Sequence, residues 1–360
     1  MIRRIQRKLL PFNIDIVNRE FASGWAFNRL MPGRPATITF KSGGRIVGKA
    51  RCDLERPDLV EQNLHRSGYA GFECVFESPL SHESGESLTI HINGSPLSAT
   101  RFEISTLPNV FTPERPLFFM HIPKTAGTSF NNVLQQYFAQ GKSHIHIQTS
   151  SLEQQKSMAD SGHFLSGHLT LEHVSNIFGN KHAVDLHSIL RDPARQLHSH
   201  IGWVMGIARD RNSGFYKKHH QLVQKMGRDL FSTDLSKPEN LSDLVNNLDG
   251  FQIDFFDNIQ TRYFLDYRPD RVSQKDCQAA LSNLSRMTSV GTTESFAAYV
   301  ENFCTLYGID TIPQTTVHNP SKVHPLFDIN DSVLEKIIEP LIRYDRQLYS
   351  TVSSLSNFAP

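Results

Sequence analysis

Two hydrophobic patterns divide this chain into a β-rich first third and an α/β remainder. Residues 13–105 contain short alternating or apolar runs, separated by turn-forming pairs such as Gly43-Gly44 and Asn93-Gly94. Such regular spacing of strands and turns is typical of a small antiparallel sandwich or barrel. Three prolines within residues 106–116 predict a linker, so the predicted domains are residues 1–105 and 117–360. The predicted strands of the first domain are residues 14–17, 24–27, 36–40, 45–50, 71–76 and 87–92.

Residues 117–135 predict a buried strand, a polar turn and a helix. The run LFFM is apolar throughout, as expected for a parallel strand covered on both faces, and apolar residues at helical spacing begin at Phe130. Between them, Lys124 supplies a cation, Gly127 permits close backbone approach, and the start of the helix supplies N–H groups. These are the groups that bind a phosphate. The alternative interpretation is an ordinary strand-to-helix turn.

A second strand-to-helix junction lies at residues 188–199. Asp192 is a good N-cap and Pro193 a good first helical residue, so a helix is expected to begin there. Arg191 then ends the strand, and Ser199 lies about two turns into the helix, on the side that reaches the same region. An arginine fork with a hydroxyl suits a phosphate monoester. The alternative is a capped helix with a surface arginine.

Alternating histidine and isoleucine at residues 144–147 predict a short strand within residues 142–148. Residues 163–168 predict another buried strand, which ends at Gly167 and His168. Ligands of open α/β sheets bind at the carboxyl ends of the strands. A histidine titrates near neutrality and can take the proton of an attacking hydroxyl, so His168 is the candidate general base. The chain has 17 histidines, and most of them are expected to be structural or solvated.

Composition excludes several classes of function. Lysine plus arginine (37) nearly balances aspartate plus glutamate (36), so no global field attracts nucleic acid. A local basic cluster at residues 209–228 suits either an acidic polysaccharide or a solvated helix face. Four cysteines without C-x-x-C or metal-ligand spacing predict reduced thiols and no metal site.

The start of the chain, MIRRIQRKLLPF, is basic but lacks the apolar region of a signal peptide. No apolar run approaches the roughly 20 residues of a membrane span. We therefore expect no transmembrane segment and a cytoplasmic protein, and the basic start leaves weak peripheral contact with an anionic membrane surface open.

The motifs together resemble those of one enzyme family. In PKTAGTS the lysine precedes the glycine, unlike the P-loop of nucleotide triphosphatases. The segment resembles the 5'-phosphosulfate loop of sulfotransferases, which use 3'-phosphoadenosine 5'-phosphosulfate (PAPS) as sulfuryl donor. Arg-Asp-Pro, with a serine eight positions after the arginine, resembles the 3'-phosphate site of these enzymes. The Gly-His pair resembles an element of heparan sulfate and dermatan 2-O-sulfotransferases, and the resemblance covers residues 116–349.

The resemblance implies a P-loop-like parallel sheet flanked by helices, an α/β fold, behind the sandwich-like module. It implies that His168 is the general base. His168 is the sole candidate of this pair, because Ser166 stands where the family often has a second histidine. It also implies a cofactor-covering loop with Lys322, an acceptor-binding helix at residues 251–267 with Arg262, and no metal. The implied donor-binding residues are Lys124, Thr125, Ala126, Gly127, Thr128, Ser129, Arg191 and Ser199.

The expected acceptor is a carbohydrate. A polysaccharide is favoured because the motifs resemble those of polysaccharide 2-O-sulfotransferases and because the N-terminal module loosely resembles one found in bacterial polysaccharide-modifying transferases. Animal relatives are anchored in the Golgi, whereas this chain shows no anchor, which favours a bacterial, cytoplasmic enzyme. A sulfotransferase-like protein that binds PAPS without an acceptor has the same motifs. Two other interpretations remain open, a non-catalytic glycan-binding protein and a nucleotide kinase with a P-loop-like fold.

Overall fold

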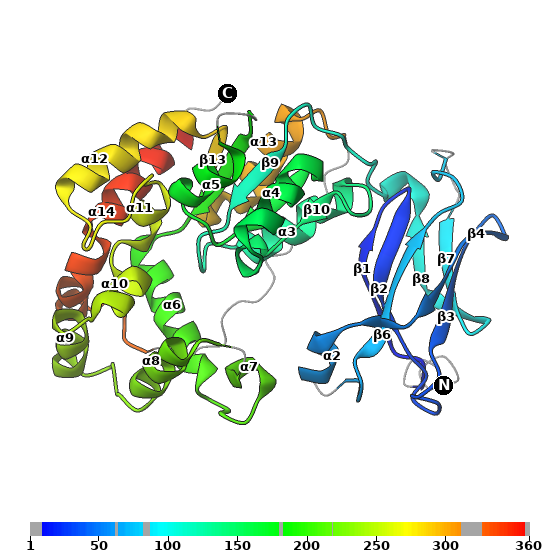
Figure 1. Cartoon of the computed structure of the whole chain (residues 1–360), viewed down its shortest axis with the longest axis horizontal. Helices are drawn as coiled ribbons and strands as arrows, with labels where there is room; N and C mark the ends of the chain where they lie inside the picture. Colours follow the sequence, from blue (N-terminus) through cyan, green and yellow to red (C-terminus); the bar gives the residue numbers. More distant parts are fainter. Residues whose placement is uncertain are drawn as a thin grey trace. The chain divides into compact units, whose positions relative to one another are not determined.

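The computed structural model describes residues 9–61, 64–81, 87–179, 183–217, 219–310 and 326–356 (Figure 1). The basic start at residues 1–8 and the loop that carries Lys322 lie outside the described residues. The chain forms two compact units. Unit 1 includes two segments that come after the predicted linker, so a single boundary in the linker does not separate the units. Unit 1 comprises Met1–Thr112, Asn132–Lys142 and Cys304–Gln314, and unit 2 comprises Pro113–Asn131, Ser143–Phe303 and Thr315–Pro360.

Unit 1 contains two four-stranded antiparallel sheets that share one hydrophobic core. Alternation produces this core, since every second residue of the strand ATITFKS is buried, from Ala36 to Ser42. The sheet orders are β1-β2-β6-β5 and β4-β3-β7-β8. The strands are β1 (Phe12–Val17), β2 (Phe21–Ala26), β3 (Ala36–Ser42), β4 (Arg45–Cys52), β5 (Leu54–Glu55), β6 (Tyr69–Val75), β7 (Ser87–Ile92) and β8 (Ser95–Glu103).

All six strands predicted in this region are confirmed, and β5 and β8 were not predicted. The Asn93-Gly94 pair forms the predicted turn between β7 and β8. Both residues have positive φ, 48° and 78°, as a two-residue type I′ hairpin requires. The short helix α2 (Pro57–Glu61) and the 3₁₀ turn η1 (Ile104–Thr106) complete these segments.

Unit 2 is built on a five-stranded parallel sheet of order β10-β11-β9-β12-β13. The central strand is the predicted LFFM segment, and all four of its side chains are buried. An α/β fold with a parallel sheet flanked by helices is therefore confirmed. The strands are β9 (Leu117–Met120), β10 (Ser143–His144), β11 (Phe164–Gly167), β12 (Asp185–Leu190) and β13 (Ser289–Thr292).

The helices of unit 2 flank this sheet and extend beyond it (Figure 1). The helices in chain order are α3 (Gly127–Leu134), α4 (Leu152–Ser161), α5 (Leu171–Phe178), α6 (Pro193–Ile207), α7 (Gly214–Lys217), α8 (Gln221–Phe231), α9 (Pro238–Asn246), α10 (Gly250–Phe256), α11 (Ile259–Tyr263), α12 (Gln274–Asn283), α13 (Phe296–Leu306) and α14 (Ser332–Ser356). The 3₁₀ turns of unit 2 are η3 (Ile147–Thr149), η4 (Leu284–Arg286) and η5 (Thr293–Ser295), whereas η2 (Gln135–Tyr137) belongs to unit 1.

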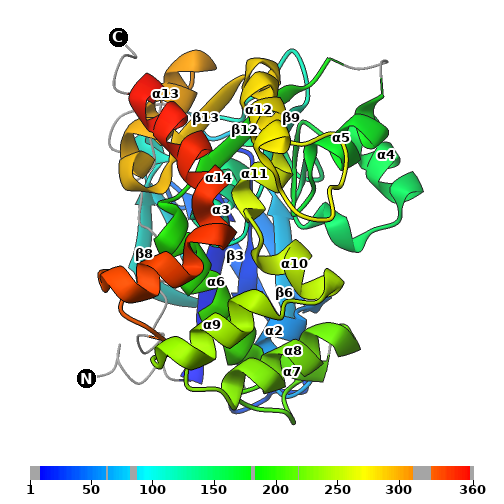
Figure 2. The same ribbon diagram turned by 90° about the vertical axis from the view of Figure 1, so that its left-hand side faces the viewer.

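The longest helix, α14, contacts α6, α9, α11 and α12 and so joins the sheet region to the helical region (Figure 2). Its apolar residues, including Leu334, Ile338 and Leu341, share a core with α6, α8 and α9. Within the described residues, no helix combines the length and apolarity needed to cross a bilayer. All four cysteines are buried and none forms a disulfide, so the prediction of reduced thiols is confirmed.

Two local predictions were wrong. The helix predicted at residues 251–267 is divided into α10 and α11, because Asn258 adopts a left-handed conformation with φ of 44°. The Asn258 side chain stabilises this break by donating to the Pro340 carbonyl and accepting from the Tyr344 N–H. The strand predicted at residues 142–148 is limited to β10, and His146 beyond it has φ of 56°.

Candidate functional site

A cavity of about 1270 Å³ lies within unit 2 at the carboxyl ends of the parallel strands. Parallel strands deliver their following loops to the same edge of the sheet, so the loops after β9, β11 and β12 meet here. Thr125 does not line the cavity; its buried hydroxyl donates to the Ile122 carbonyl at 2.9 Å. The other predicted site residues among the described ones all line it: Lys124, Ala126, Gly127, Thr128, Ser129, His168, Arg191, Ser199 and Arg262.

The loop after β9 has an unusual backbone. Lys124 and Ala126 are both left-handed, with φ of 69° and 64°, although neither is glycine. Such conformations are costly and concentrate at functional sites, and turns of this kind direct backbone N–H groups into anion-binding concavities. Helix α3 begins at Gly127, so the N–H groups of its first turn have no acceptor within the helix.

Close packing fixes the glycine of this loop. A Cβ atom on Gly127 would lie 2.0 Å from Cδ2 of His121, which follows β9 directly. The loop also accepts hydrogen bonds from neighbouring elements. The Arg191 Nη1 donates to the Lys124 carbonyl at 3.1 Å, and the Gln196 amide donates to the Pro123 carbonyl at 2.9 Å. The loop conformation is therefore held by β12 and α6 together.

Positive charge is concentrated at the loop. Burial, and secondly the charge of Arg191, lower the pKa of Lys124. Burial also lowers the pKa of Arg191. Among the described residues, no ion pair includes either side chain. A bound anion would relieve both cations, because two like charges in a partly desolvated cavity disfavour each other.

The second junction folds as predicted. Asp192 caps α6 by accepting from the Arg195 N–H at 2.9 Å, and Pro193 is the first helical residue. Ser199, two turns along α6, is 4% exposed and lines the cavity. Arg191 is held through its backbone, because the Gln260 side chain accepts from its N–H and donates to its carbonyl, each at 2.9 Å.

His168 follows β11, and two hydrogen bonds orient it. Its backbone N–H donates to Oε1 of Gln148, and its ring Nδ1 lies 2.5 Å from the carbonyl oxygen of His121. A carbonyl only accepts, so Nδ1 carries the proton and Nε2 carries a lone pair. Burial lowers the pKa of His168 to about 4. The ring is therefore neutral at pH 7, and Nε2 is able to accept a proton.

Arg262 lines the cavity, but its guanidinium already makes four hydrogen bonds. They go to the carboxylate and carbonyl of Asp257 and to the carbonyls of Pro269 and Asp270, at 2.7–3.0 Å. The side chain is 7% exposed and also forms a longer ion pair with Asp254. Its contacts therefore hold α10, α11 and the following loop together, and its predicted role in acceptor binding stays a prediction.

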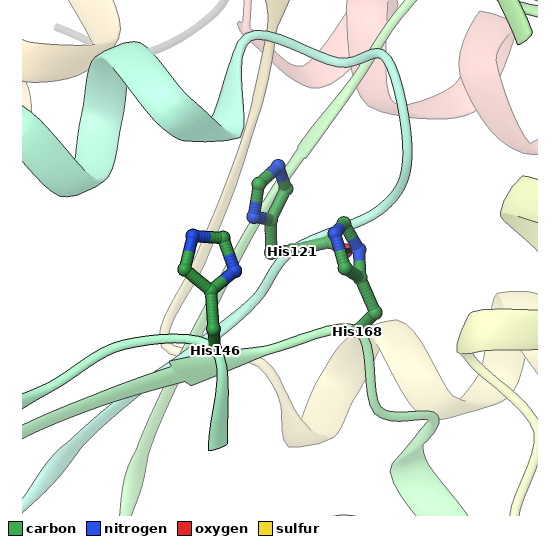
Figure 3. Close-up of side chains that lie close together, drawn as sticks. All are labelled: His121, His146 and His168. Atoms are coloured by element: carbon green, nitrogen blue, oxygen red, sulfur yellow. Dashed lines mark hydrogen bonds between the residues drawn. The ribbon is translucent and has the colours of Figure 1, made fainter. Parts of the chain in front are cut away.

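The sequence analysis missed two histidines of the site. His121 and His146 place one ring nitrogen each near His168, so that the three nitrogens lie within 4.8 Å of one another (Figure 3). His121 was detectable, since it follows the predicted strand β9 as His168 follows β11. His146 was assigned to a strand, whereas it lies in the turn before η3.

Aromatic residues from the helical region form another wall of the cavity. Trp203, Phe251, Phe255 and Tyr267 line it, together with the paired charges of Asp254 and Arg268. This wall lies apart in sequence from the loop after β9, so one cavity combines a cationic edge at Lys124 and Arg191 with an aromatic surface. No protein-family model and no curated protein matches this chain.

Proposed function

We propose that this protein is a PAPS-dependent O-sulfotransferase with a P-loop-like fold. The observation that carries the proposal is the convergence of Lys124, Arg191 and His168 from three adjacent strand ends on one cavity. Two of these side chains are cations that form no ion pair with a described residue, and the third is a neutral histidine. A donor with two separate phosphate-type groups and an acceptor hydroxyl match this combination.

The donor is held by the residues of two loops. The loop from Lys124 to Ser129, in which Lys124 and Ala126 have left-handed backbone conformations, binds the 5'-phosphosulfate through backbone N–H groups and the lysine ammonium. Arg191 and Ser199 bind the 3'-phosphate, because a guanidinium fork and a hydroxyl match the oxygens of a phosphate monoester. Because a separate pair of residues, Arg191 and Ser199, binds the 3'-phosphate, the site selects a 3'-phosphorylated nucleotide.

The chemistry is a single in-line displacement at sulfur. The acceptor oxygen forms a bond to sulfur while the bond from sulfur to the 5'-phosphate oxygen breaks, and the hydroxyl proton passes to Nε2 of His168. The products are the sulfate ester and 3'-phosphoadenosine 5'-phosphate (PAP). Lys124 stabilises the negative charge that develops on the leaving phosphate, by analogy with phosphoryl transfer.

A carbohydrate is the proposed acceptor. Sugar rings stack on aromatic faces and their hydroxyls pair with charged side chains, and the wall formed by Trp203, Phe251 and Phe255 beside Asp254 offers both. A cavity of this volume accommodates the donor together with part of a polymer.

Calorimetric titration with PAP tests the donor site. We expect tight binding to the wild-type protein, weakening by a hundredfold or more in Lys124→Ala and Arg191→Ala, and no comparable binding of ATP. Arg209→Ala is the matched control, because Arg209 is an exposed arginine outside the cavity lining. Absence of PAP binding would refute the proposal, and equal affinity for ATP and PAP would favour a nucleotide kinase.

Transfer from radiolabelled PAPS to a panel of desulfated polysaccharides tests the base. His168→Ala is expected to lower transfer by about a hundredfold to ten-thousandfold with unchanged affinity for PAP. His173→Ala is the control, because His173 is an exposed histidine that lines the same cavity. Full transfer activity in His168→Ala would exclude the assigned role.

A further inference from the structure

Three histidines gather at one edge of the sheet of unit 2. His121 follows β9, His168 follows β11, and His146 lies between β10 and η3, so each comes from the carboxyl end of a neighbouring strand. One nitrogen of each ring lies within 4.8 Å of the other two, and Figure 3 shows the rings converging. The His121 and His168 rings are in contact, with centroids 4.3 Å apart.

The hydrogen bonds of the cluster leave nitrogens able to bind a cation. Nδ1 of His168 is committed to the His121 carbonyl, which leaves the Nε2 lone pair. A metal-bound histidine typically donates its other ring N–H to a backbone carbonyl in this way. Nδ1 of His121 is buried in a side chain only 5% exposed and has no hydrogen-bond partner. Such a buried polar atom is costly unless a ligand satisfies it.

The geometry points to a divalent transition-metal site of the zinc type at His121, His146 and His168. Three imidazoles without a carboxylate suit zinc, cobalt or copper and not magnesium or calcium, which prefer oxygen ligands. Three protein ligands also leave a fourth position open, as in catalytic zinc sites.

Closing the cluster on an ion requires a modest movement. Nitrogens at 2.0–2.1 Å from a tetrahedral ion lie about 3.3 Å apart, so the widest pair must approach by up to about 1.5 Å. His146 can make most of this movement, because it is exposed and lies in a turn. His121 and His168 are packed against each other and form the fixed side of the site.

Metal binding has a consequence that rests on the proposed function. The Nε2 lone pair of His168 cannot bind a metal ion and accept the acceptor proton at the same time. An occupied cluster therefore blocks transfer, whereas the donor-binding residues Lys124 and Arg191 remain in place. Zinc is expected to inhibit transfer at least tenfold, with relief by a chelator.

Cobalt binding tests the site without any need for activity. The untagged full chain, first dialysed against a chelator, is titrated with Co²⁺, and we expect one equivalent to produce the intense visible absorption of four-coordinate cobalt. Zn²⁺ should displace it. His146→Ala is expected to weaken Co²⁺ binding at least a hundredfold, whereas His173→Ala, a cavity histidine outside the cluster, should bind like wild type.

Two results would overturn the inference. One is the absence of four-coordinate absorption in the wild-type protein, and the other is equal Co²⁺ affinity in wild type and His146→Ala. PAP titration of His146→Ala verifies that the variant is folded, since His146 lies outside the donor-binding residues. A protein that binds PAP but no cobalt refutes the metal site alone, and one that binds cobalt but no PAP refutes the proposed function alone.

Discussion

Gln260 holds the backbone of Arg191 with both ends of its side-chain amide. Its Oε1 accepts from the Arg191 N–H and its Nε2 donates to the Arg191 carbonyl, each at 2.9 Å, and the Gln260 side chain is fully buried. The position of Arg191, the residue proposed to bind the 3'-phosphate, is therefore set by α11 as well as by β12. Gln260, which is remote in the sequence from the proposed phosphate-binding motifs, thus holds the backbone at one of them.

Gln260→Ala is expected to weaken PAP binding about tenfold, because two buried hydrogen bonds to the Arg191 backbone are lost while the guanidinium remains. Titration calorimetry measures the effect. Gln274→Ala is the control, since Gln274 is an exposed glutamine on α12. Unchanged PAP affinity in a folded Gln260→Ala protein would contradict this role.

Gly127→Ala is expected to abolish PAP binding and to lower the free energy of unfolding by about 1–3 kcal/mol, because the new Cβ would meet His121 at 2.0 Å. Urea denaturation and PAP titration give the two readouts. Gly206→Ala provides the comparison, as its Cβ would meet nothing within 4 Å and alanine is favoured within α6. Equal behaviour of the two variants would show that the loop tolerates a side chain.

Arg262→Gln is expected to lower the free energy of unfolding by about 3–5 kcal/mol, because it leaves the buried carboxylate of Asp257 without its cation. Arg343→Gln, which breaks an exposed pair with Glu339, should leave the free energy of unfolding close to that of the wild type, because exposed ion pairs contribute little. Urea denaturation measures both. An unchanged free energy of unfolding for Arg262→Gln would contradict this structural role and favour a role of Arg262 in binding the acceptor alone.

Asp345 predicts a specific pH dependence of stability. Burial raises the pKa of Asp345 from 3.8 to about 7, despite hydrogen bonds from Thr261 and the Gln260 N–H. Between about pH 4 and pH 7 the folded protein thus binds more protons at this group than the unfolded chain. Its contribution to the free energy of unfolding is therefore greatest at low pH, falls as the pH rises to about 7, and is constant above.

Buried histidines act in the opposite direction, since burial lowers the pKa of His187 and His200 to about 3. The effect of Asp345 is therefore isolated by subtracting the unfolding free energies of Asp345→Asn from those of the wild type, measured in urea at pH 4.5 to 8. The difference should decrease with rising pH. Parallel curves for the two proteins would contradict the assignment.

The sequence was sufficient where a structural feature depends on neighbouring residues. The LFFM strand, the turn at Asn93-Gly94 and the Asp192 cap are all local, and all were predicted. The break between α10 and α11 was not, because residues 251–267 keep a helical pattern of apolar positions throughout. Asn258 is left-handed owing to its contacts with α14, more than eighty positions later.

The candidate site was predictable to the same extent. The loop residues, Arg191, Ser199 and His168 were found because each follows a recognisable strand or helix start. The contacts of Gln260 with Arg191 and of Asp345 with α11 were not predicted, because the partners lie 69 and 84–85 positions apart and no local pattern marks such pairs. The grouping of His146 with His121 likewise depends on the order of the strands in the sheet.

The connection from Asp345 through α11 to Arg191 also bears on biosynthesis. Asp345 lies on α14, and its carboxylate accepts from the N–H groups of Gln260 and Thr261 at the start of α11. During translation the loop at Lys124 leaves the ribosome long before α14 does. The nascent chain thus carries the strand and loop at Lys124 before the helix that holds α11 in place. We therefore expect the arrangement that positions Arg191 at the cavity to be complete only after the segment containing Asp345 has been made and has folded against α11.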